Sequence, residues 1–86
     1  MKKNIKFSCI IIGYNTQESL LELLKSINSQ DYSNNDIEII YVDDGSNDKS
    51  YEKFLDYSLP YTKKSSKFYD NRGRVFATQE GIKLAS

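Results

Sequence analysis

Residues 37–50, IEIIYVDDGSNDKS, carry the strongest structural signal of this chain. The stretch begins with β-branched and aromatic residues, which favour a strand, and two adjacent carboxylates, Asp43 and Asp44, follow directly. Because like charges repel each other, this pair needs solvent, a cation or hydrogen-bond donors around it. Gly45 then allows a sharp turn at little steric cost. The stretch therefore predicts a strand that ends in a polar turn.

The segment before this stretch predicts a strand followed by a helix. KFSCIIIGY, residues 6–14, is a continuous apolar run of the kind found in strands that are buried on both faces. Residues 15–30 change to the helical period. The apolar residues with that spacing are Leu20, Leu23, Leu24 and Ile27. Asn15 and Glu18 match a capping box that would start this helix.

The segment after the acidic pair predicts a second helix. Ser46 is its candidate N-cap, since a serine oxygen can accept a hydrogen bond from a free N–H group of the first turn. Pro60 would end the helix, because proline has no N–H group to donate. The inward face would hold Tyr51, Phe54 and Leu55.

The last part of the chain is more polar. KKSSK, residues 63–67, is interpreted as a solvated loop, and a short strand is expected from Lys67 to Tyr69. GRVFATQEGIKLAS, residues 73–86, predicts a third helix, which Gly81 weakens. The residues expected to face inward on this helix are Val75, Ile82 and Ala85.

The order of these elements predicts the fold class. Strands that alternate with helices are typical of an α/β protein with a parallel sheet between two helical layers, connected by right-handed crossovers. Ligands of such sheets bind at the carboxyl ends of the strands. If the first two strands pair in parallel, GYN (residues 13–15) and DDGS (residues 43–46) face the same crevice.

Two uses of the acidic pair stay open at this point. An aspartate before a glycine is a common turn signal, and for Asp44 turn formation and ligand contact are equally compatible with the sequence. A carboxylate at the end of a strand can also accept hydrogen bonds from a ligand, which turn formation does not explain. We favour this second use for Asp43.

The composition excludes several other classes of protein. The 86 residues carry 12 basic and 12 acidic side chains, so no net charge attracts nucleic acid or an anionic membrane. The single cysteine, Cys9, excludes an internal disulfide, and the chain has no histidine with which it could form a zinc site. No segment is long and apolar enough to span a membrane. We therefore expect a cytoplasmic location, with association of a full-length protein with the cytoplasmic face of a membrane as the alternative.

Three motifs stand in a characteristic order along the chain. FSCIIIGYN (residues 7–15) ends in a tip similar to Pro-Thr-Tyr-Asn, YVDDGS (residues 41–46) matches Val-Asp-Asp-Gly-Ser, and DNRGRVFATQEG (residues 70–81) carries Asn-x-Gly before a helix. Each motif alone is a weak signal, but the ordered set covers nearly the whole chain. In this respect the chain resembles the family 2 glycosyltransferases.

The resemblance implies a GT-A fold, in which residues 1–86 form the incomplete amino-terminal portion of a nucleotide-sugar-binding domain. The implied donor is a nucleotide-diphosphate sugar, usually uridine-based, and the implied acceptor is a hydroxyl of a glycan or a lipid-linked molecule. By the family pattern, Asp43 matches the acidic residue that binds the nucleotide base. The residues implied to bind the nucleotide are Gly13, Tyr14, Asn15, Asp43, Asp44, Asn71, Gly73 and Arg74.

The chain also departs from the family pattern. Ile12 and Gly13 replace the usual Pro-Thr, and Thr78 stands where an arginine is common. The family's Asp-x-Asp metal motif and catalytic base would come after Ser86, so we assign no residue of this chain to catalysis or to a metal. The resemblance implies Mg²⁺ or Mn²⁺ in a full-length enzyme, and these 86 residues alone are not expected to transfer sugar.

An alternative is a non-catalytic α/β module that binds nucleotides or associates with itself. A truncated parallel sheet leaves an unpaired strand edge and uncovered apolar surface, so we expect a homo-oligomer. The tyrosines, Tyr41 among them, are interpreted as packing residues rather than as groups that stack on a sugar.

Overall fold

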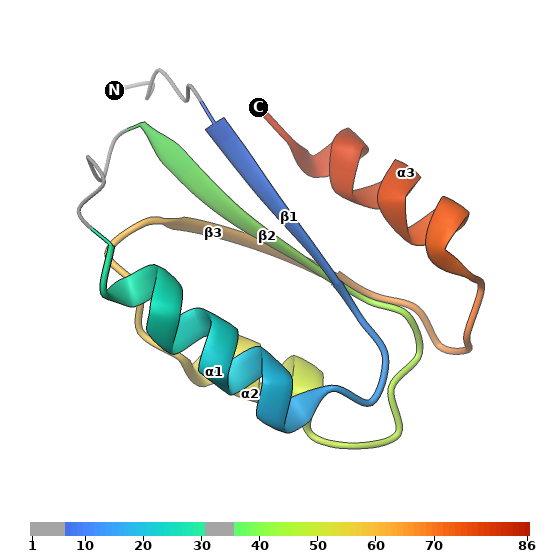
Figure 1. Cartoon of the computed structure of the whole chain (residues 1–86). Coiled ribbons are helices and arrows are strands. Elements are labelled where there is room, and N and C mark those ends of the chain that lie inside the picture. Colours follow the sequence, from blue (N-terminus) through green and yellow to red (C-terminus); the bar gives the residue numbers. More distant parts are fainter. Residues whose placement is uncertain (1–6, 31–35) are drawn as a thin grey trace.

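A computed structural model describes residues 7–30 and 36–86 of the chain. In these residues strands and helices alternate along the sequence, as Figure 1 shows. The elements are β1 (Phe7–Gly13), α1 (Gln17–Asn28), β2 (Ile37–Asp43), α2 (Ser50–Asp56), β3 (Thr62–Lys67) and α3 (Arg74–Leu84). None of the helices in the described ranges is long and apolar enough to cross a bilayer.

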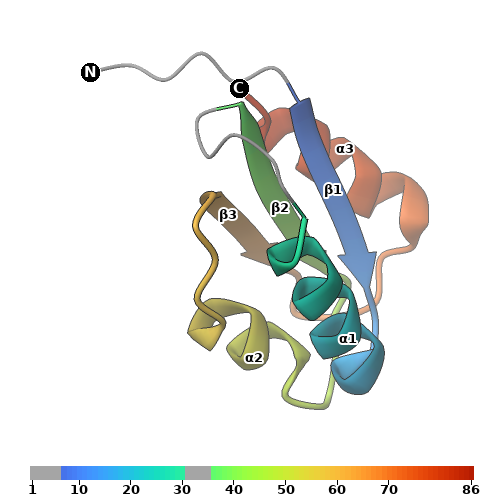
Figure 2. The same cartoon turned by 60° about the vertical axis from the view of Figure 1, so that its left-hand side comes forward.

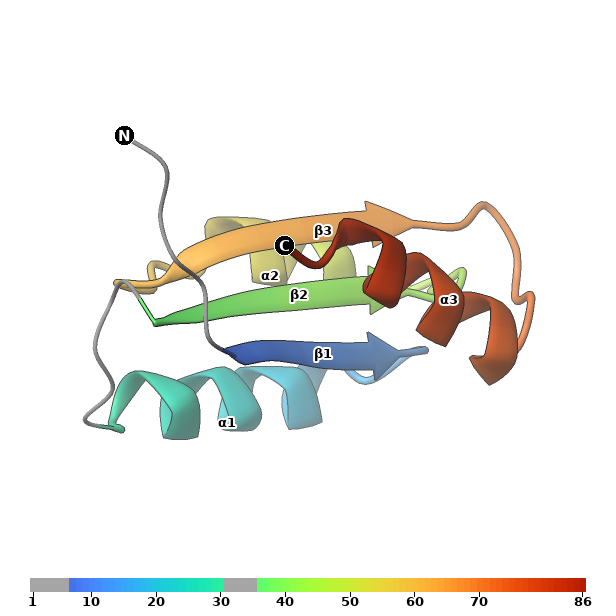
Figure 3. The ribbon, with the colours of Figure 1, turned by 90° about the horizontal axis from the view of Figure 1, so that it is seen from above.

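The strands form a parallel sheet in the order β1-β2-β3. All three arrowheads point the same way in Figure 3, so the carboxyl ends of the strands share one edge. Helices α1 and α2 cover one face of the sheet and α3 covers the other, which Figure 2 shows in depth. The predicted three-layer α/β fold with a parallel sheet is therefore confirmed.

The central strand, β2, explains why its sequence is so apolar. All its residues are buried, because helices cover both of its faces. Successive side chains of a strand point to opposite faces. Ile39 and Tyr41 pack in the core on the side of α1 and α2, whereas Ile40 and Val42 pack against Ala77 of α3. Strand β2 is therefore the central strand of the sheet and contributes side chains to the core on both of its faces.

Strand β1 is less buried than its sequence predicts. Phe7 is 66% exposed, and of the residues in this strand only Gly13 is fully buried. Within the described residues β1 pairs with β2 alone, so it forms an edge of the sheet. Cys9 is half-buried in this strand, and burial raises the pKa of its thiol.

The predicted helix caps are wrong. Helix α1 begins at Gln17, and the side-chain oxygen of Asn15 accepts a hydrogen bond from the distant Asn47 N–H instead of capping the helix. Helix α2 begins at Ser50 rather than next to Ser46. Both cap candidates are used in contacts between segments about 30 residues apart in sequence, which outweigh their local propensity.

Helix α2 is shorter than expected and shows a narrower inward face. It ends at Asp56, before Pro60 is reached. Phe54 is fully buried and Tyr51 is half-buried, as predicted, but Leu55 is 51% exposed. The buried stripe of this short helix is therefore built around one aromatic side chain.

The basic run at residues 63–67 is a strand, not the predicted solvated loop, and the strand begins earlier than the expected Lys67. Long lysine stems can pack on apolar surface while their ammonium groups reach polar partners. Lys63 Nζ donates to the carbonyl oxygens of Phe54 and Tyr57 at the end of α2, at 2.7 and 2.6 Å. These partners at the end of the preceding helix stabilise a polar sequence in the sheet.

The inward face of α3 also differs from the prediction. Val75 and Ile82 are 68% and 61% exposed, whereas the small residues Ala77 and Gly81 are buried. A Cβ atom on Gly81 would lie only 2.5 Å from Cγ2 of Ile10. Small residues therefore let α3 approach the sheet closely. The prediction was right for Ala85 alone, which packs against the core just beyond the helix.

A buried charge cluster fastens the end of α3 to the amino-terminal edge of the sheet. Glu38 of β2 is fully buried, and its carboxylate accepts hydrogen bonds from the Ser8 hydroxyl at 2.6 Å and the Ser86 N–H at 2.7 Å. Lys64 Nζ lies 2.9 Å from the other oxygen. Burial alone would raise the pKa of Glu38, but these hydrogen bonds and the Lys64 charge lower that pKa from 4.5 to about 2.

This cluster predicts an acid-sensitive contribution to stability. Because the folded state lowers the pKa of Glu38, the contribution is complete above pH 4.5 and is lost as the pH falls towards about 2. Glu38→Gln should lower the free energy of unfolding at pH 7 by on the order of 3 kcal/mol, since each pKa unit corresponds to about 1.4 kcal/mol. The difference should shrink steadily below pH 4.5 in urea unfolding curves.

Glu22→Gln is the control for this experiment, because Glu22 is exposed on α1 and should change stability little at any pH. A difference between wild type and Glu38→Gln that stays constant from pH 7 to pH 2.5 would contradict the role of the Glu38 charge.

Candidate functional site

The candidate site lies at the carboxyl edge of the sheet, where three segments meet. We call residues 13–15 the β1 tip, residues 43–46 the β2 tip and residues 70–73 the 70–73 loop. Gly13 pairs with Asp43 in the β1–β2 register, and the Asp44 N–H donates to the Gly13 carbonyl at 2.8 Å. The Phe68 N–H donates to the Asp43 carbonyl at 2.9 Å. The strand ends are thus joined by backbone hydrogen bonds beyond the sheet itself.

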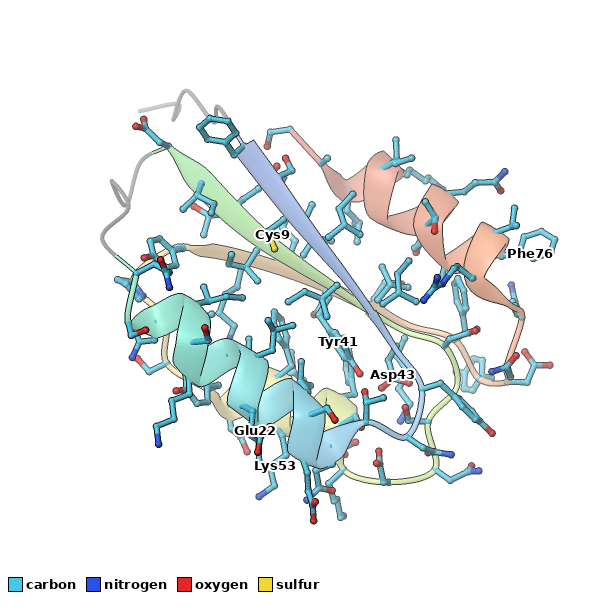
Figure 4. All side chains as sticks on the ribbon, in the orientation of Figure 1. Cys9, Glu22, Tyr41, Asp43, Lys53 and Phe76 are labelled. Atoms are coloured by element: carbon cyan, nitrogen blue, oxygen red, sulfur yellow. The ribbon has the colours of Figure 1, made fainter. Side chains whose placement is uncertain are left out.

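Asp43 is the buried centre of this edge. Its exposed fraction is 0%, and both carboxylate oxygens accept hydrogen bonds from the protein. Oδ1 accepts from the Ser46 N–H at 2.6 Å, and Oδ2 accepts from the Tyr41 hydroxyl at 2.9 Å. Tyr41 and Asp43 lie two residues apart in a strand, so both point to the side of α1 and α2, as Figure 4 shows.

Asp44 has different partners and joins β2 to the 70–73 loop. Its two oxygens accept hydrogen bonds from the Arg72 N–H at 2.7 Å and the Gly73 N–H at 3.1 Å. Gly45 brings the backbones together, since its φ is +82° and an added Cβ would lie 2.6 Å from Asn71 N. The Asp44 carboxylate therefore binds a distant loop, whereas the local turn is held by Asp43, which accepts from the Ser46 N–H.

The β1 tip is fastened to the β2 tip through polar side chains. Asn15 has a positive φ of 52°, a conformation that asparagine tolerates better than most residues. Its N–H donates to Ser46 Oγ at 2.8 Å, and its side-chain oxygen accepts from the Asn47 N–H at 2.7 Å. The Thr16 N–H donates to Ser50 Oγ at 3.2 Å. These contacts close the tip over the neighbouring strand end.

The structure brings the residues predicted to bind the nucleotide to one edge, but with different exposure. A hydrogen-bonded network holds Gly13, Asn15, Asp43, Asp44 and Gly73. The remaining predicted residues lie at its rim and are exposed: Tyr14, Asn71 and Arg74. The Arg72 guanidinium sits 5.1 Å from the centre of the Phe68 ring and 3.3 Å from an Asp70 oxygen.

Sequence reasoning missed three contributors to the site. Tyr41 donates to Asp43, Ser46 accepts from the β1 tip, and Asn47 donates to Asn15. The period of two in a strand places Tyr41 beside Asp43 and could have identified the tyrosine. Ser46 belongs to the DDGS turn that the sequence placed at the crevice, but its contact with Asn15 and that of Asn47 join residues more than 30 positions apart, which no local pattern indicates.

Two open hollows flank the joined tips. One, of about 450 Å³, is lined by Ser46, Lys67, Phe68 and Tyr69. The other, of about 400 Å³, is lined by Asp48 and residues 15–19. The first combines aromatic rings with an ammonium group, while the second is polar. Both offer concave surface beside the buried Asp43.

The acidic pair does not fit a divalent metal. Asp43 accepts from Tyr41 and Ser46, whereas Asp44 accepts from the N–H groups of the 70–73 loop, so the two carboxylates serve separate donors. Among residues 7–30 and 36–86, no three Asp, Glu, Cys or His side chains come together as metal ligands. We derive no chemical step through a metal held by these residues.

The family model and the similar proteins all identify the same family, the glycosyl transferases of family 2. The model of "Glycosyl transferase family 2" matches residues 8–86. Poly-beta-1,6-N-acetyl-D-glucosamine synthase of Staphylococcus epidermidis is 35% identical over 79 residues, which cover 92% of this chain and 19% of that protein. The poly(ribitol-phosphate) beta-N-acetylglucosaminyltransferase TarS of Staphylococcus aureus is 33% identical over 69 residues, 80% of this chain and 12% of TarS.

Solved structures show the same fold. The crystal structure of S. aureus TarS 1–349 has a TM-score of 0.87 and 30% identity, covering 95% of this chain and 25% of that one. The mannosyltransferase PcManGT from Pyrobaculum calidifontis, solved with GDP-Man and Mn²⁺, has a TM-score of 0.84 and 18% identity. It covers 100% of this chain, which spans 28% of PcManGT. The chain therefore spans between about an eighth and about a quarter of these proteins.

The contact between Gly45 and the 70–73 loop predicts unequal effects of two glycine substitutions. Gly45→Ala adds a methyl group against the Asn71 backbone at a positive φ. It should lower the free energy of unfolding by on the order of 3 kcal/mol and move the amide signals of the loop. Gly73 also has a positive φ, but no atom lies within 4 Å of the Cβ that Gly73→Ala would add. It should cost only about 1–2 kcal/mol.

Urea unfolding and two-dimensional NMR of the two variants measure this difference. Equal losses of stability in Gly45→Ala and Gly73→Ala would show that the close approach of the β2 tip to the loop is not what Gly45 provides.

Proposed function

Since the chain belongs to glycosyl transferase family 2, whose model matches residues 8–86, we propose that it forms the nucleoside-binding part of a glycosyltransferase. The enzyme would transfer a sugar from a nucleotide-diphosphate donor, a UDP-sugar, to a hydroxyl of a glycan or lipid-linked acceptor. The relatives support this class of reaction, since their names describe transfer or polymerisation of N-acetylglucosamine. PcManGT, which shares the fold, was solved with a nucleotide sugar and Mn²⁺.

One observation carries the proposal for the site. The β1 tip and the β2 tip lie side by side at the carboxyl edge of a parallel sheet, with Gly13 in register with Asp43. Sheets of this kind bind ligands at that edge. A base that rests against the two tips could donate an N–H group to Asp43, while Tyr14 lines the nucleoside pocket and Asn71 and Arg74 lie near the rest of the nucleotide.

A ligand can bind Asp43 only after a rearrangement, because the carboxylate is fully covered. The β1 tip is one segment that could move, since Asn15 is bound to Ser46 and Asn47 of the neighbouring turn. Two hydrogen bonds connect Asn15 to the β2 tip, and the positive φ of Asn15 makes this closed conformation less favourable for the backbone. We propose that the tip opens when the nucleotide binds, and that Asp44 keeps the 70–73 loop in place.

We propose that these 86 residues bind the nucleotide without transferring sugar. Transfer requires that the charge of the leaving diphosphate is neutralised and that the acceptor hydroxyl loses its proton. The described part of the chain brings together no set of metal ligands, and the chain spans 19% of the N-acetylglucosamine polymer synthase that it matches. We assign the Mg²⁺ or Mn²⁺ site and the general base to portions of the family fold outside this span.

Titration with uridine diphosphate tests the site. We expect chemical shift changes confined to residues 13–15, 43–45 and 71–74, with millimolar affinity. Asp43→Asn removes the charge that accepts from the base and should weaken binding by roughly 10-fold, the typical effect of a hydrogen bond to a charged group. Asp56→Asn, at an exposed position on α2, is the control and should bind as wild type does. Shifts elsewhere, or none up to millimolar ligand, would overturn the assignment.

We also propose that the isolated chain associates with a second copy of itself. Strand β1 has one unpaired edge among the described residues, and apolar side chains of α3 stand exposed, with Phe76 at 59% and Ile82 at 61%. Figure 4 shows Phe76 pointing away from the sheet. Apolar surface and a strand edge of this kind favour association.

Light scattering over a range of concentrations should show growth from monomer to dimer or larger species. Phe76→Ser combined with Ile82→Ser should shift the equilibrium towards monomer. A wild-type chain that stays monomeric at high concentration would exclude this association.

A further inference from the structure

Tyr41 is a core residue whose hydroxyl reaches the candidate site. The side chain is fully buried, and its ring stacks on Phe54 with a centroid distance of 5.1 Å. Figure 4 shows Tyr41 between the sheet and the layer of α1 and α2, near Asp43. A phenylalanine would fill the same apolar space, so the packing of the ring does not explain the hydroxyl. The hydroxyl donates to Asp43 Oδ2 at 2.9 Å.

Gly13 leaves the space that this hydroxyl occupies. A Cβ atom on Gly13 would lie 2.8 Å from the Tyr41 oxygen and 3.0 Å from its Cε1. The Tyr41 ring cannot move aside easily, because Phe54 and the sheet enclose it. The β1 tip therefore tolerates the hydroxyl only with a glycine at position 13, and the two residues form a matched pair.

The hydroxyl stays a hydrogen-bond donor at working pH. Burial raises the pKa of Tyr41, and the hydrogen bond to Asp43 and the negative charge of Asp43 raise it further. The hydroxyls of Ser50 and Thr16 oppose this shift without reversing it. The Tyr41 hydroxyl therefore stays protonated and donates a hydrogen bond to Asp43.

We propose that Tyr41 is the positioning residue of the nucleotide site, because its hydroxyl fixes the orientation in which the Asp43 carboxylate meets the base. The inference rests on the proposed function of Asp43 as the acceptor. Tyr41 holds one oxygen of the carboxylate and the Ser46 N–H holds the other, so the plane of the carboxylate is fixed. A carboxylate has about four acceptor positions. The remaining positions are the ones that an N–H group of a base would use once the cover over Asp43 has moved.

Tyr41→Phe tests the role directly, since it keeps the ring and removes only the donor. The affinity for uridine diphosphate should fall by about 5-fold to 20-fold, as expected when a hydrogen bond to a charged group is lost. Tyr61→Phe is the matched control. Tyr61 is also buried, and its hydroxyl donates to the Gln30 carbonyl at 3.3 Å, away from the tips. This control should change the affinity less than about 2-fold, although both variants lose a buried hydroxyl.

A second measurement does not depend on the ligand. Gly13→Ala should destabilise the wild-type chain, because the added methyl group meets the Tyr41 oxygen. In the Tyr41→Phe background that oxygen is absent, so the same substitution should shift the urea midpoint by clearly less. Thr16 Oγ1 also lies 2.7 Å from the added Cβ, so Gly13→Ala should keep part of its cost in the Tyr41→Phe background. The difference between the two backgrounds therefore measures the part of the cost that depends on the Tyr41 hydroxyl.

The outcomes separate the two proposals. Weaker binding in Tyr41→Phe, unchanged binding in Tyr61→Phe and a smaller effect of Gly13→Ala in the Tyr41→Phe background would support the positioning role. Wild-type affinity in Tyr41→Phe would overturn that role and leave the proposed function standing. If the wild-type chain shows no shifts at the tips with uridine diphosphate, the proposed function fails and the positioning role fails with it.

Discussion

The rest of the structure depends on how two adjacent carboxylates are satisfied at the end of β2. Successive residues of a strand point in opposite directions, so Asp43 and Asp44 meet different donors instead of each other. Asp43 accepts from Tyr41 and the Ser46 N–H, and Asp44 accepts from two N–H groups of the 70–73 loop. Separate donors thus satisfy the two carboxylates. Asp43 stabilises the β2 tip itself, and Asp44 joins this tip to the 70–73 loop. As a result, the buried carboxylate of Asp43 lies at the centre of the carboxyl edge of the sheet.

Much of the fold was predictable, because its main signal is local. The change along the chain from continuous apolar runs to the helical period of 3.6 identified the alternation of strands and helices and hence the parallel sheet. Several wrong predictions involve partners that the local sequence does not indicate. Asn15 and Ser46 form hydrogen bonds between the two tips instead of capping helices. Lys64 forms an ion pair with the buried Glu38, within a polar run that is a strand. Gly81 lies so close to Ile10 that no larger side chain would fit there.

The candidate site was predictable in its residue types and only partly in its geometry. The motifs identified Gly13 and Asp43, and the register of the sheet brings them together. The sequence did not reveal that Asp43 is fully covered, or that the hydroxyl of a core tyrosine holds it. Tyr41 has the character of a packing residue, and its contact with Asp43 depends on a hydroxyl that the glycine at position 13 leaves room for. Substrate and acceptor are proposals, because the chain spans a small part of its relatives.

A crystal structure of the chain with uridine diphosphate is the most direct test of the nucleoside site. We expect the pyrimidine ring against the β1 and β2 tips, with an N–H group donating to Asp43, the Tyr41 hydroxyl still on the other oxygen, and Asn15 displaced from Ser46. A nucleotide bound away from this edge, or one bound beside it while Asp43 stays covered, would contradict the assignment of Asp43 as the acceptor for the base.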